Sequence, residues 1–198
     1  MPNLSSINGT LFLVRHGETR LSGRYCGSTN PPLTRRGFIQ ARSVARRLAR
    51  VSMDVCYTSP LLRAEQTATL IHHRRAAPLI KHSLLKEIHF GAWEGLRFQD
   101  IEKKWPHLAK RWSVDPTKVR VPGGETFISV RRRVKRFLAL MKASLSTSNV
   151  LIVAHGATLS AIVLELLGRP NREFPKYMQP LGSVRRVQGR TLKWISPC

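Results

Sequence analysis

Two short apolar runs constrain the fold of this chain more than any other feature of its sequence. Residues 10–15 (TLFLVR) and 150–154 (VLIVA) are almost wholly apolar, and both lead directly into a His-Gly pair. A short strand that is apolar on both faces has to be covered on both faces, which is typical of parallel sheets lying between helices. The two runs therefore predict an α/β protein with these strands at its centre.

Segments with helical spacing alternate with these strands. The spacing predicts a helix over 35–50 with Thr34 as its N-cap, and another helix that starts at Ser59-Pro60, a cap residue followed by proline. Strands alternating with helices predict a three-layer α/β/α fold with a mostly parallel sheet. The remaining predicted elements are strands over 54–58 and 79–81, helices after Gly124 and over about 157–167, and a hairpin around Gln188-Gly189-Arg190.

The segment 88–122 departs from this alternation. It is rich in Trp, Pro and Gly, and Pro106 should break any helix there into two pieces. We interpret it as a cap-like excursion over a cleft, within a single domain that spans 1–198. Its large aromatic side chains either shape the wall of that cleft or form the core of the cap; they are Trp93, Phe98, Trp105 and Trp112.

The chain carries a large excess of positive charge. Lys and Arg number 34 against 11 Asp and Glu, which gives a formal net charge of +23. No acid occurs between Glu18 and Asp54, or between Glu125 and Glu165. Solvated basic helix faces are the simpler interpretation of these stretches, and nonspecific binding of polyanions is the alternative.

Cysteine usage and hydropathy bear on the compartment. Cys26, Cys56 and Cys198 are odd in number and widely spaced, which argues against a disulfide framework and against a cysteine zinc site. The N-terminus lacks the pattern of a signal peptide, and no apolar run approaches the length of a membrane span. We expect a cytoplasmic protein without a membrane partner.

Charged side chains follow the predicted strands at their carboxyl ends. Arg15-His16 ends the first strand, Arg63 lies just after the second, and His155 follows VLIVA. Ligands of open α/β sheets bind at these strand ends, so neighbouring strands would bring two arginines and two histidines together. Arginine suits the oxygens of a phosphate, and histidine can act as nucleophile or proton shuttle.

Such a cationic site suits phosphoryl transfer. A neutral imidazole would attack phosphorus, and a carboxylic acid, which keeps its proton beside a bound phosphate, would protonate the leaving oxygen. The residues themselves leave Glu18, Glu87 and Glu94 open for that second role. The histidines without such a setting are expected to be structural or solvent-facing; they are His72, His73, His82, His89 and His107.

Two other interpretations compete with this one. Two histidines and a glutamate can form a facial metal triad, but Arg15 and Arg63 would place a metal cation among cations. A catalytic fold can also serve recognition alone. The complete Arg-His-Arg-Glu-His set argues against lost catalysis, and the aromatic residues do not interleave with the basic runs as in a stacking platform.

These residues, in this order, resemble the histidine phosphatase superfamily, which contains cofactor-dependent phosphoglycerate mutases and many phosphatases. The resemblance covers roughly residues 10 to 170. RHG alone is a weak match to the family, whereas the whole ordered set of motifs is highly specific. The motifs are LVRHGET at 13–19, PLTRRGFIQA at 32–41, TSPLLRAEQTA at 58–68, KEIHFGAWEG at 86–95, VPGGET at 121–126 and VAHGATLSAI at 153–162.

The resemblance implies the histidine phosphatase fold and roles for the matching residues. His16 would be the nucleophile that becomes phosphohistidine, and Glu87 the proton donor that later activates water. That choice leaves Glu18 and Glu94 structural. The family needs no metal and no other cofactor. The phosphoryl oxygens would be held by Arg15, Arg63 and His155.

One loop departs from the family pattern. Family members often carry Asn soon after the first arginine and then Ser or Thr before Gly, whereas this loop looks shorter and has Ser22 and Cys26 at those places. The candidates for further substrate contacts are Ser22, Cys26 and Gly156.

The short loop and the compact 88–122 segment resemble phosphatases of the α-ribazole phosphatase kind, which act in cobalamin nucleotide-loop assembly, and broad-specificity phosphatases. Mutases carry longer insertions. The resemblance thus implies hydrolysis of a small phosphorylated metabolite, with α-ribazole 5′-phosphate as one candidate. The alternatives are mutase-type phosphoryl transfer and a non-catalytic polyanion-binding module.

Overall fold

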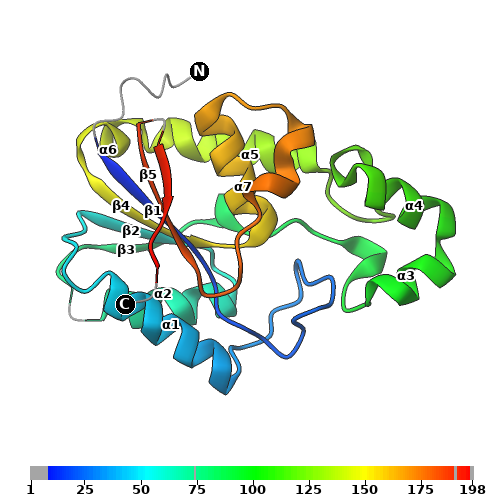
Figure 1. Ribbon diagram of the computed structural model, residues 1–198, viewed down its shortest axis with the longest axis horizontal. Helices are drawn as coiled ribbons and strands as arrows, with labels where there is room; N and C mark the ends of the chain where they lie inside the picture. The colour runs from blue at the N-terminus through cyan, green and yellow to red at the C-terminus, as the bar shows by residue number, and fades with distance from the viewer. Residues whose placement is uncertain (1–8, 74, 190, 197–198) are drawn as a thin grey trace.

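The computed structural model describes residues 9–73, 75–189 and 191–196, and within them a six-stranded sheet lies between helices (Figure 1). The strand order is β3-β2-β4-β1-β5-β6. Strands β3, β2, β4 and β1 are parallel, β5 pairs antiparallel with β1, and β6 pairs antiparallel with β5. This confirms a three-layer α/β/α fold with a mostly parallel sheet. The strands are β1 (Thr10–Arg15), β2 (Val55–Thr58), β3 (Leu79–Lys81), β4 (Asn149–Ala154), β5 (Val184–Gln188) and β6 (Thr191–Trp194).

The central strand β1 shows why its sequence is apolar at successive positions. Leu11 and Leu13 face one core, which α5 (Phe127–Leu140) and α7 (Gly156–Leu167) cover. Phe12 and Val14 face a second core, which α1 (Arg35–Arg47) and α2 (Leu62–His72) cover. Alternate side chains of one strand thus enter opposite layers, as expected for a sheet buried on both faces.

Two helix boundaries differ from the sequence prediction, because α1 ends at Arg47 rather than at residue 50 and α2 starts later than expected. Thr34 caps α1, since its side chain accepts a hydrogen bond from the Gly37 amide. The prediction that α2 starts at Ser59-Pro60 is wrong, because Leu61 is still extended and the helix begins at Leu62. The Ser59 hydroxyl accepts the Leu61 amide and also contacts a histidine ring, so it closes a tight turn before the helix.

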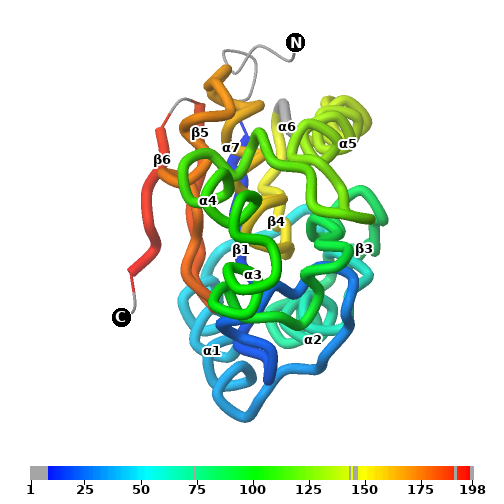
Figure 2. Tube along the Cα trace, turned by 90° about the vertical axis from the view of Figure 1, so that its right-hand side faces the viewer, coloured from blue at the N-terminus to red at the C-terminus, as the bar shows by residue number. Residues whose placement is uncertain are grey.

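The segment 88–122 projects from the sheet layer (Figure 1, right) and faces the viewer in Figure 2. Pro106 is the first residue of α4 and separates it from α3, which confirms the predicted break. The segment has its own small core around Trp93 and Ile101. Its elements are the 3₁₀ helices η3 (Gly91–Trp93) and η4 (Pro116–Lys118), and the α-helices α3 (Phe98–Lys104) and α4 (Pro106–Val114).

The chain ends in the predicted hairpin of β5 and β6, although Arg190 at its turn lies outside the described residues. Residues 1–8 and Cys198 also lie outside them, and the single domain over 1–198 stays a prediction. Across the described ranges, no helix combines the length and the apolar character needed to cross a membrane. The remaining helices are α6 (Lys142–Thr147) and the 3₁₀ helices η2 (Ser83–Leu85) and η5 (Asn171–Tyr177).

Candidate active site

The sheet register brings the predicted site residues together. Strands β2, β4 and β1 are neighbours, and Arg15 pairs with Ala154 across the parallel ladder. His16 and His155, which come directly after this pair, therefore lie side by side at the strand ends. The centroids of their rings are 5.0 Å apart. From α2, the Arg63 Nε lies 3.3 Å from the His16 Nε2. The predicted convergence of two arginines and two histidines is confirmed.

The hydrogen bonds of His16 define which ring nitrogen carries its proton. Nδ1 lies 2.7 Å from the carbonyl oxygen of Gly17, which can only accept, so we assign the proton to Nδ1. The lone pair of Nε2 then accepts from the Arg63 Nε–H. Burial lowers the pKa of His16 well below its usual range, and the charge of Arg63 lowers it further. His16 is therefore a neutral imidazole with its lone pair on Nε2.

His155 is completely buried beside His16. Its Nε2 lies 2.8 Å from the Ser59 hydroxyl, and its Nδ1 has no hydrogen-bond partner among the described residues. Burial lowers the pKa of His155 well below its usual range, and Arg63 and His16 contribute in the same direction. The ring does not line the cavity described below, so it forms part of the layer behind His16.

Arg15 extends from the end of β1 toward the cavity. Its Nη1 donates to the carbonyl of Gln179 at 2.6 Å, and its buried Nε has no partner among the described residues. Gly156 leaves room for it, because a Cβ there would lie 3.3 Å from the Arg15 Cζ and 2.8 Å from the Met178 Cε. Gly156 thus serves the site by its small size.

Glu87 precedes the cap segment in the chain, and its side chain lies against the N-terminus of α7. Its carboxylate accepts from the amides of Ala157 at 3.1 Å and Thr158 at 3.2 Å, and also from its neighbour Ile88 at 3.0 Å. These donors hold the carboxyl group at the edge of the same cavity that Arg15 and His16 line. Of the three acids that residue chemistry left open, only Glu87 lines this cavity among the described residues.

The other two acids hold backbone and side chains in place. Glu18 accepts from the Thr34 hydroxyl and lies 3.6 Å from Arg36. Glu94 accepts several hydrogen bonds from the loop 26–29. Burial raises the pKa of Glu94, but hydrogen bonds from Phe90 and this loop outweigh it and hold the pKa below its usual value.

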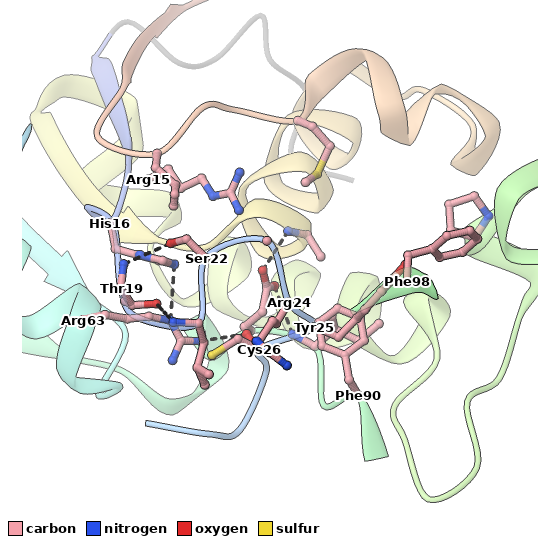
Figure 3. Close-up of a pocket in the computed structure, with 18 of the residues that line it drawn as sticks. Arg15, His16, Thr19, Ser22, Arg24, Tyr25, Cys26, Arg63, Phe90 and Phe98 are labelled. Carbon is pink, nitrogen blue, oxygen red and sulfur yellow. Dashed lines mark hydrogen bonds between the residues drawn. The ribbon is translucent and has the colours of Figure 1, made fainter. Parts of the chain in front are cut away.

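A cavity of about 480 Å³ opens above the charged residues (Figure 3). Phe98 and Trp112 line the cavity and also pack against the core of the cap, whereas Trp93 and Trp105 pack in that core and do not line the cavity. Sequence reasoning missed several residues of the wall that lie outside the cap segment and the predicted catalytic set. Among them are Phe127, Phe174, Met178 and Leu181.

Ser22 and Cys26 both line this cavity. The Ser22 hydroxyl accepts from the Thr19 amide, and the Cys26 carbonyl accepts from Arg63. Burial raises the pKa of the Cys26 thiol, so it is not an activated nucleophile.

The structure describes all the histidines besides His16 and His155, and none of them lines the cavity. They are His72, His73, His82, His89 and His107.

This arrangement places a neutral nucleophilic nitrogen between two guanidinium groups (Figure 3), and the Glu87 carboxyl group lines the same cavity. Such a site can bind a phosphoryl group and stabilise the charge that spreads over its oxygens. Within the described ranges, no three His, Cys, Asp or Glu side chains are grouped so that they could hold a metal ion.

Comparison with known proteins agrees with this chemistry. The profile of the Histidine phosphatase superfamily (branch 1) matches residues 11–195. Phosphoserine phosphatase 1 of Hydrogenobacter thermophilus is 38% identical over 160 residues, which cover 80% of this chain and 76% of that protein. The adenosylcobalamin/alpha-ribazole phosphatase of Escherichia coli is 35% identical over 162 residues, or 81% of this chain and 80% of the relative.

A solved structure shows the same architecture. The alpha-ribazole phosphatase from Shigella flexneri superposes with a TM-score of 0.83 at 31% sequence identity. The alignment covers 93% of this chain and 94% of that one.

Proposed function

The chain belongs to branch 1 of the histidine phosphatase superfamily and is a phosphatase, and from this we propose that it hydrolyses a small phosphomonoester through a phosphohistidine on His16. The observation that carries the proposal is the state of the His16 ring. Its Nδ1–H is held by a carbonyl, and its Nε2 lone pair lies beside Arg63. A neutral ring so oriented can attack phosphorus without first losing a proton.

In the first step, the His16 Nε2 forms a bond to phosphorus while the bond from phosphorus to the ester oxygen breaks. Glu87 gives its proton to that leaving oxygen, which departs as an alcohol. In the second step, Glu87 takes a proton from water as the water oxygen attacks phosphorus. The nitrogen–phosphorus bond breaks, which releases inorganic phosphate and returns His16 to its neutral form.

The cations around His16 would hold the phosphoryl oxygens. Arg15 has an unpartnered Nε, and the Arg63 Nε–H that now faces His16 would turn to an oxygen when the nucleophile attacks. His155 would act through its unpartnered Nδ1, which requires a small movement because the ring is buried. Ser22, Cys26 and Gly156 remain candidates for further contacts.

Metal independence is part of the proposal. Two guanidinium groups flank the only imidazole that lines the described cavity, and they oppose the binding of a further cation there. They also supply the positive charge that a metal would bring to a phosphoryl transfer.

The cytoplasm is the proposed location, since the odd and widely spaced cysteines do not suggest a disulfide framework.

The wall of the cavity favours a flat, apolar leaving group. Its aromatic side chains come from the loop at Tyr25, from the cap at Phe90, Phe98 and Trp112, from Phe127 in α5 and from Phe174 in η5. Rings stacked on such a wall gain both apolar burial and ring–ring contacts. The proposed substrate class is therefore a phosphate ester of an aromatic nucleoside-like alcohol, with α-ribazole 5′-phosphate as the candidate.

Phosphoserine is the second candidate, because a phosphoserine phosphatase is among the relatives. Its ammonium group would need an acidic partner, and Glu87 is the one carboxylate among the residues that line the described cavity. Since Glu87 is assigned to proton transfer, the wall argues for the aromatic substrate. Mutase-type transfer and a non-catalytic polyanion-binding role are the remaining alternatives.

A panel of phosphomonoesters tests the proposal. Phosphate release is measured in EDTA from α-ribazole 5′-phosphate, phosphoserine, 3-phosphoglycerate and an activated aryl phosphate, with wild type and His16→Ala side by side. We expect turnover by wild type alone, and the highest kcat/KM for α-ribazole 5′-phosphate. Phosphoserine as best substrate would overturn the assignment of the leaving group, and loss of wild-type activity in EDTA would overturn metal independence.

A further inference from the structure

We propose that Glu94 is a positioning residue, which acts through the loop 26–29 to hold Arg63 against His16. The proposal rests on the proposed function only in assigning Arg63 and His16 to catalysis. Glu94 comes from the start of the cap segment and does not line the catalytic cavity. It acts through other residues, by the chain of hydrogen bonds that follows.

The first link joins Glu94 to the backbone amides of the loop. Gly27 donates to both carboxylate oxygens, at 3.2 and 3.1 Å, and Ser28 donates at 2.8 Å. Thr29 donates twice, from its amide at 3.3 Å and from its hydroxyl at 2.7 Å. The Phe90 amide completes the set at 3.0 Å. Every one of these partners is a donor, so the carboxylate is surrounded by hydrogens alone.

The second link joins the opposite side of the same loop to Arg63. Its Nη1 donates to the carbonyl of Thr29 at 2.8 Å. Its Nη2 donates to the carbonyls of Gly27 at 2.9 Å and Cys26 at 3.2 Å. The loop therefore presents its amides to Glu94 and its carbonyls to Arg63, and it fixes the spacing between the two side chains.

The third link is the contact between Arg63 and the nucleophile. With both terminal nitrogens of Arg63 held by the loop, its Nε–H points at the His16 Nε2, 3.3 Å away. A shift of the loop would move this donor directly. Small displacements of a group that positions the reacting atoms have large effects on rate.

The loop has little freedom to settle elsewhere. Gly27 is buried, and a Cβ on it would lie 2.0 Å from the carbonyl oxygen of Ile88 and 2.6 Å from the Glu94 Oε1. Only the absence of a side chain allows the loop to approach the cap so closely. Glu94 and Gly27 thus form one tight junction between the cap and the catalytic arginine.

Glu94→Gln tests the junction with a side chain of the same shape. Because donors surround both carboxylate oxygens, the amide NH₂ must face N–H or O–H groups whichever way it turns. We expect kcat/KM for an activated aryl phosphate to fall roughly 10- to 100-fold. The Nε–H resonance of Arg63, followed by NMR in the absence of substrate, should shift or broaden.

Glu165→Gln is the matched control. Glu165 is also half-buried and accepts a hydrogen bond from Arg131 at 2.6 Å, but it lies in α7 away from the loop. This variant should keep the Arg63 resonance and a kcat/KM within about two-fold of wild type, since Glu165 shares no partner with the loop 26–29 or with Arg63. If Glu94→Gln fails to fold, Thr29→Val replaces it, because it deletes one donor to Glu94 and keeps the backbone. An intermediate effect is then expected.

A double-mutant cycle with Arg63→Lys separates the proposed path from general destabilisation. If Glu94 acts through Arg63, its substitution should cost little more once Arg63 is already lost. An unchanged Arg63 resonance in Glu94→Gln would overturn the proposal whatever happens to activity, and so would additive effects in the cycle. The resonance needs no turnover, so a protein inactive toward the whole panel would refute the proposed function while leaving this inference testable.

Discussion

At the scale of single residues, the site depends on two histidines that burial keeps neutral. Burial is the largest influence on both His16 and His155, and it lowers the pKa of each. Neutral rings suit a nucleophile and a hydrogen-bond donor, but they make the folded state sensitive to acid. The unfolded chain binds protons on both rings below about pH 6.5, whereas the folded chain does not.

Stability should therefore fall as the pH drops below about 6.5. Each histidine contributes a slope of up to about 1.4 kcal/mol per pH unit, which continues until the pH reaches its lowered folded-state pKa. Urea unfolding from pH 7.5 to pH 5 measures the effect. His16→Asn should reduce the slope. A free energy of unfolding that stays level over this range would contradict the neutral assignment.

Ser59 offers a second prediction at this scale. Its hydroxyl is the one partner of the His155 ring among the described hydrogen bonds. Ser59→Ala leaves the His155 Nε2 buried without a partner, which should cost about 1–3 kcal/mol of unfolding free energy. Ser160→Ala is the matched control, because the Ser160 hydroxyl is equally buried but has no partner to lose. Equal effects of the two substitutions in urea unfolding would contradict the account.

At the scale of elements, the cap helices supply one wall of the substrate cavity. Phe98 begins α3 and faces the cavity, so Phe98→Ala should raise KM for an aryl phosphate about 10-fold and change little for a small alkyl phosphate. Val114→Ala, in the neighbouring helix but 81% exposed, should change neither. Steady-state kinetics on both esters make the comparison. A uniform change on both substrates would place Phe98 in the fold of the cap rather than in specificity.

Sequence patterns predicted elements well where one local rule dominated. The apolar run of β1, the N-cap at Thr34 and the break at Pro106 each followed from neighbouring residues. The start of α2 did not, because the Ser59 hydroxyl is engaged by His155, which follows β4 and is far along the chain. No local pattern carries that contact.

The site itself divides in the same way. Strand ends and the family motifs predicted His16, Arg15, Arg63, Glu87 and His155, and the structure brings them together. The wall from η5 was missed, since Phe174 and Met178 lie in a Pro-containing segment without periodicity. Their position depends on how that segment folds back over α7, which spacing alone does not indicate.

At the scale of the whole molecule, the charge of +23 is the least explained property. Arg35, Arg42 and Arg46 lie exposed along α1, and Arg50 follows its end. Such a surface should bind duplex DNA weakly, with an affinity that falls steeply between 50 and 200 mM salt. Fluorescence anisotropy with a random duplex measures this. An affinity that does not change with salt would show that the basic faces are solvated and have no polyanion partner.

The central claim is that His16 carries the phosphoryl group during turnover. The most direct test is to mix the enzyme with an activated aryl phosphate and to quench the reaction rapidly in alkali, where phosphohistidine persists. Mass spectrometry of the peptides then locates the phosphoryl group bound to the protein. We predict one phosphoryl group on the peptide that contains His16, and none in His16→Ala. Turnover without a labelled His16, or a label on another residue, would contradict the account.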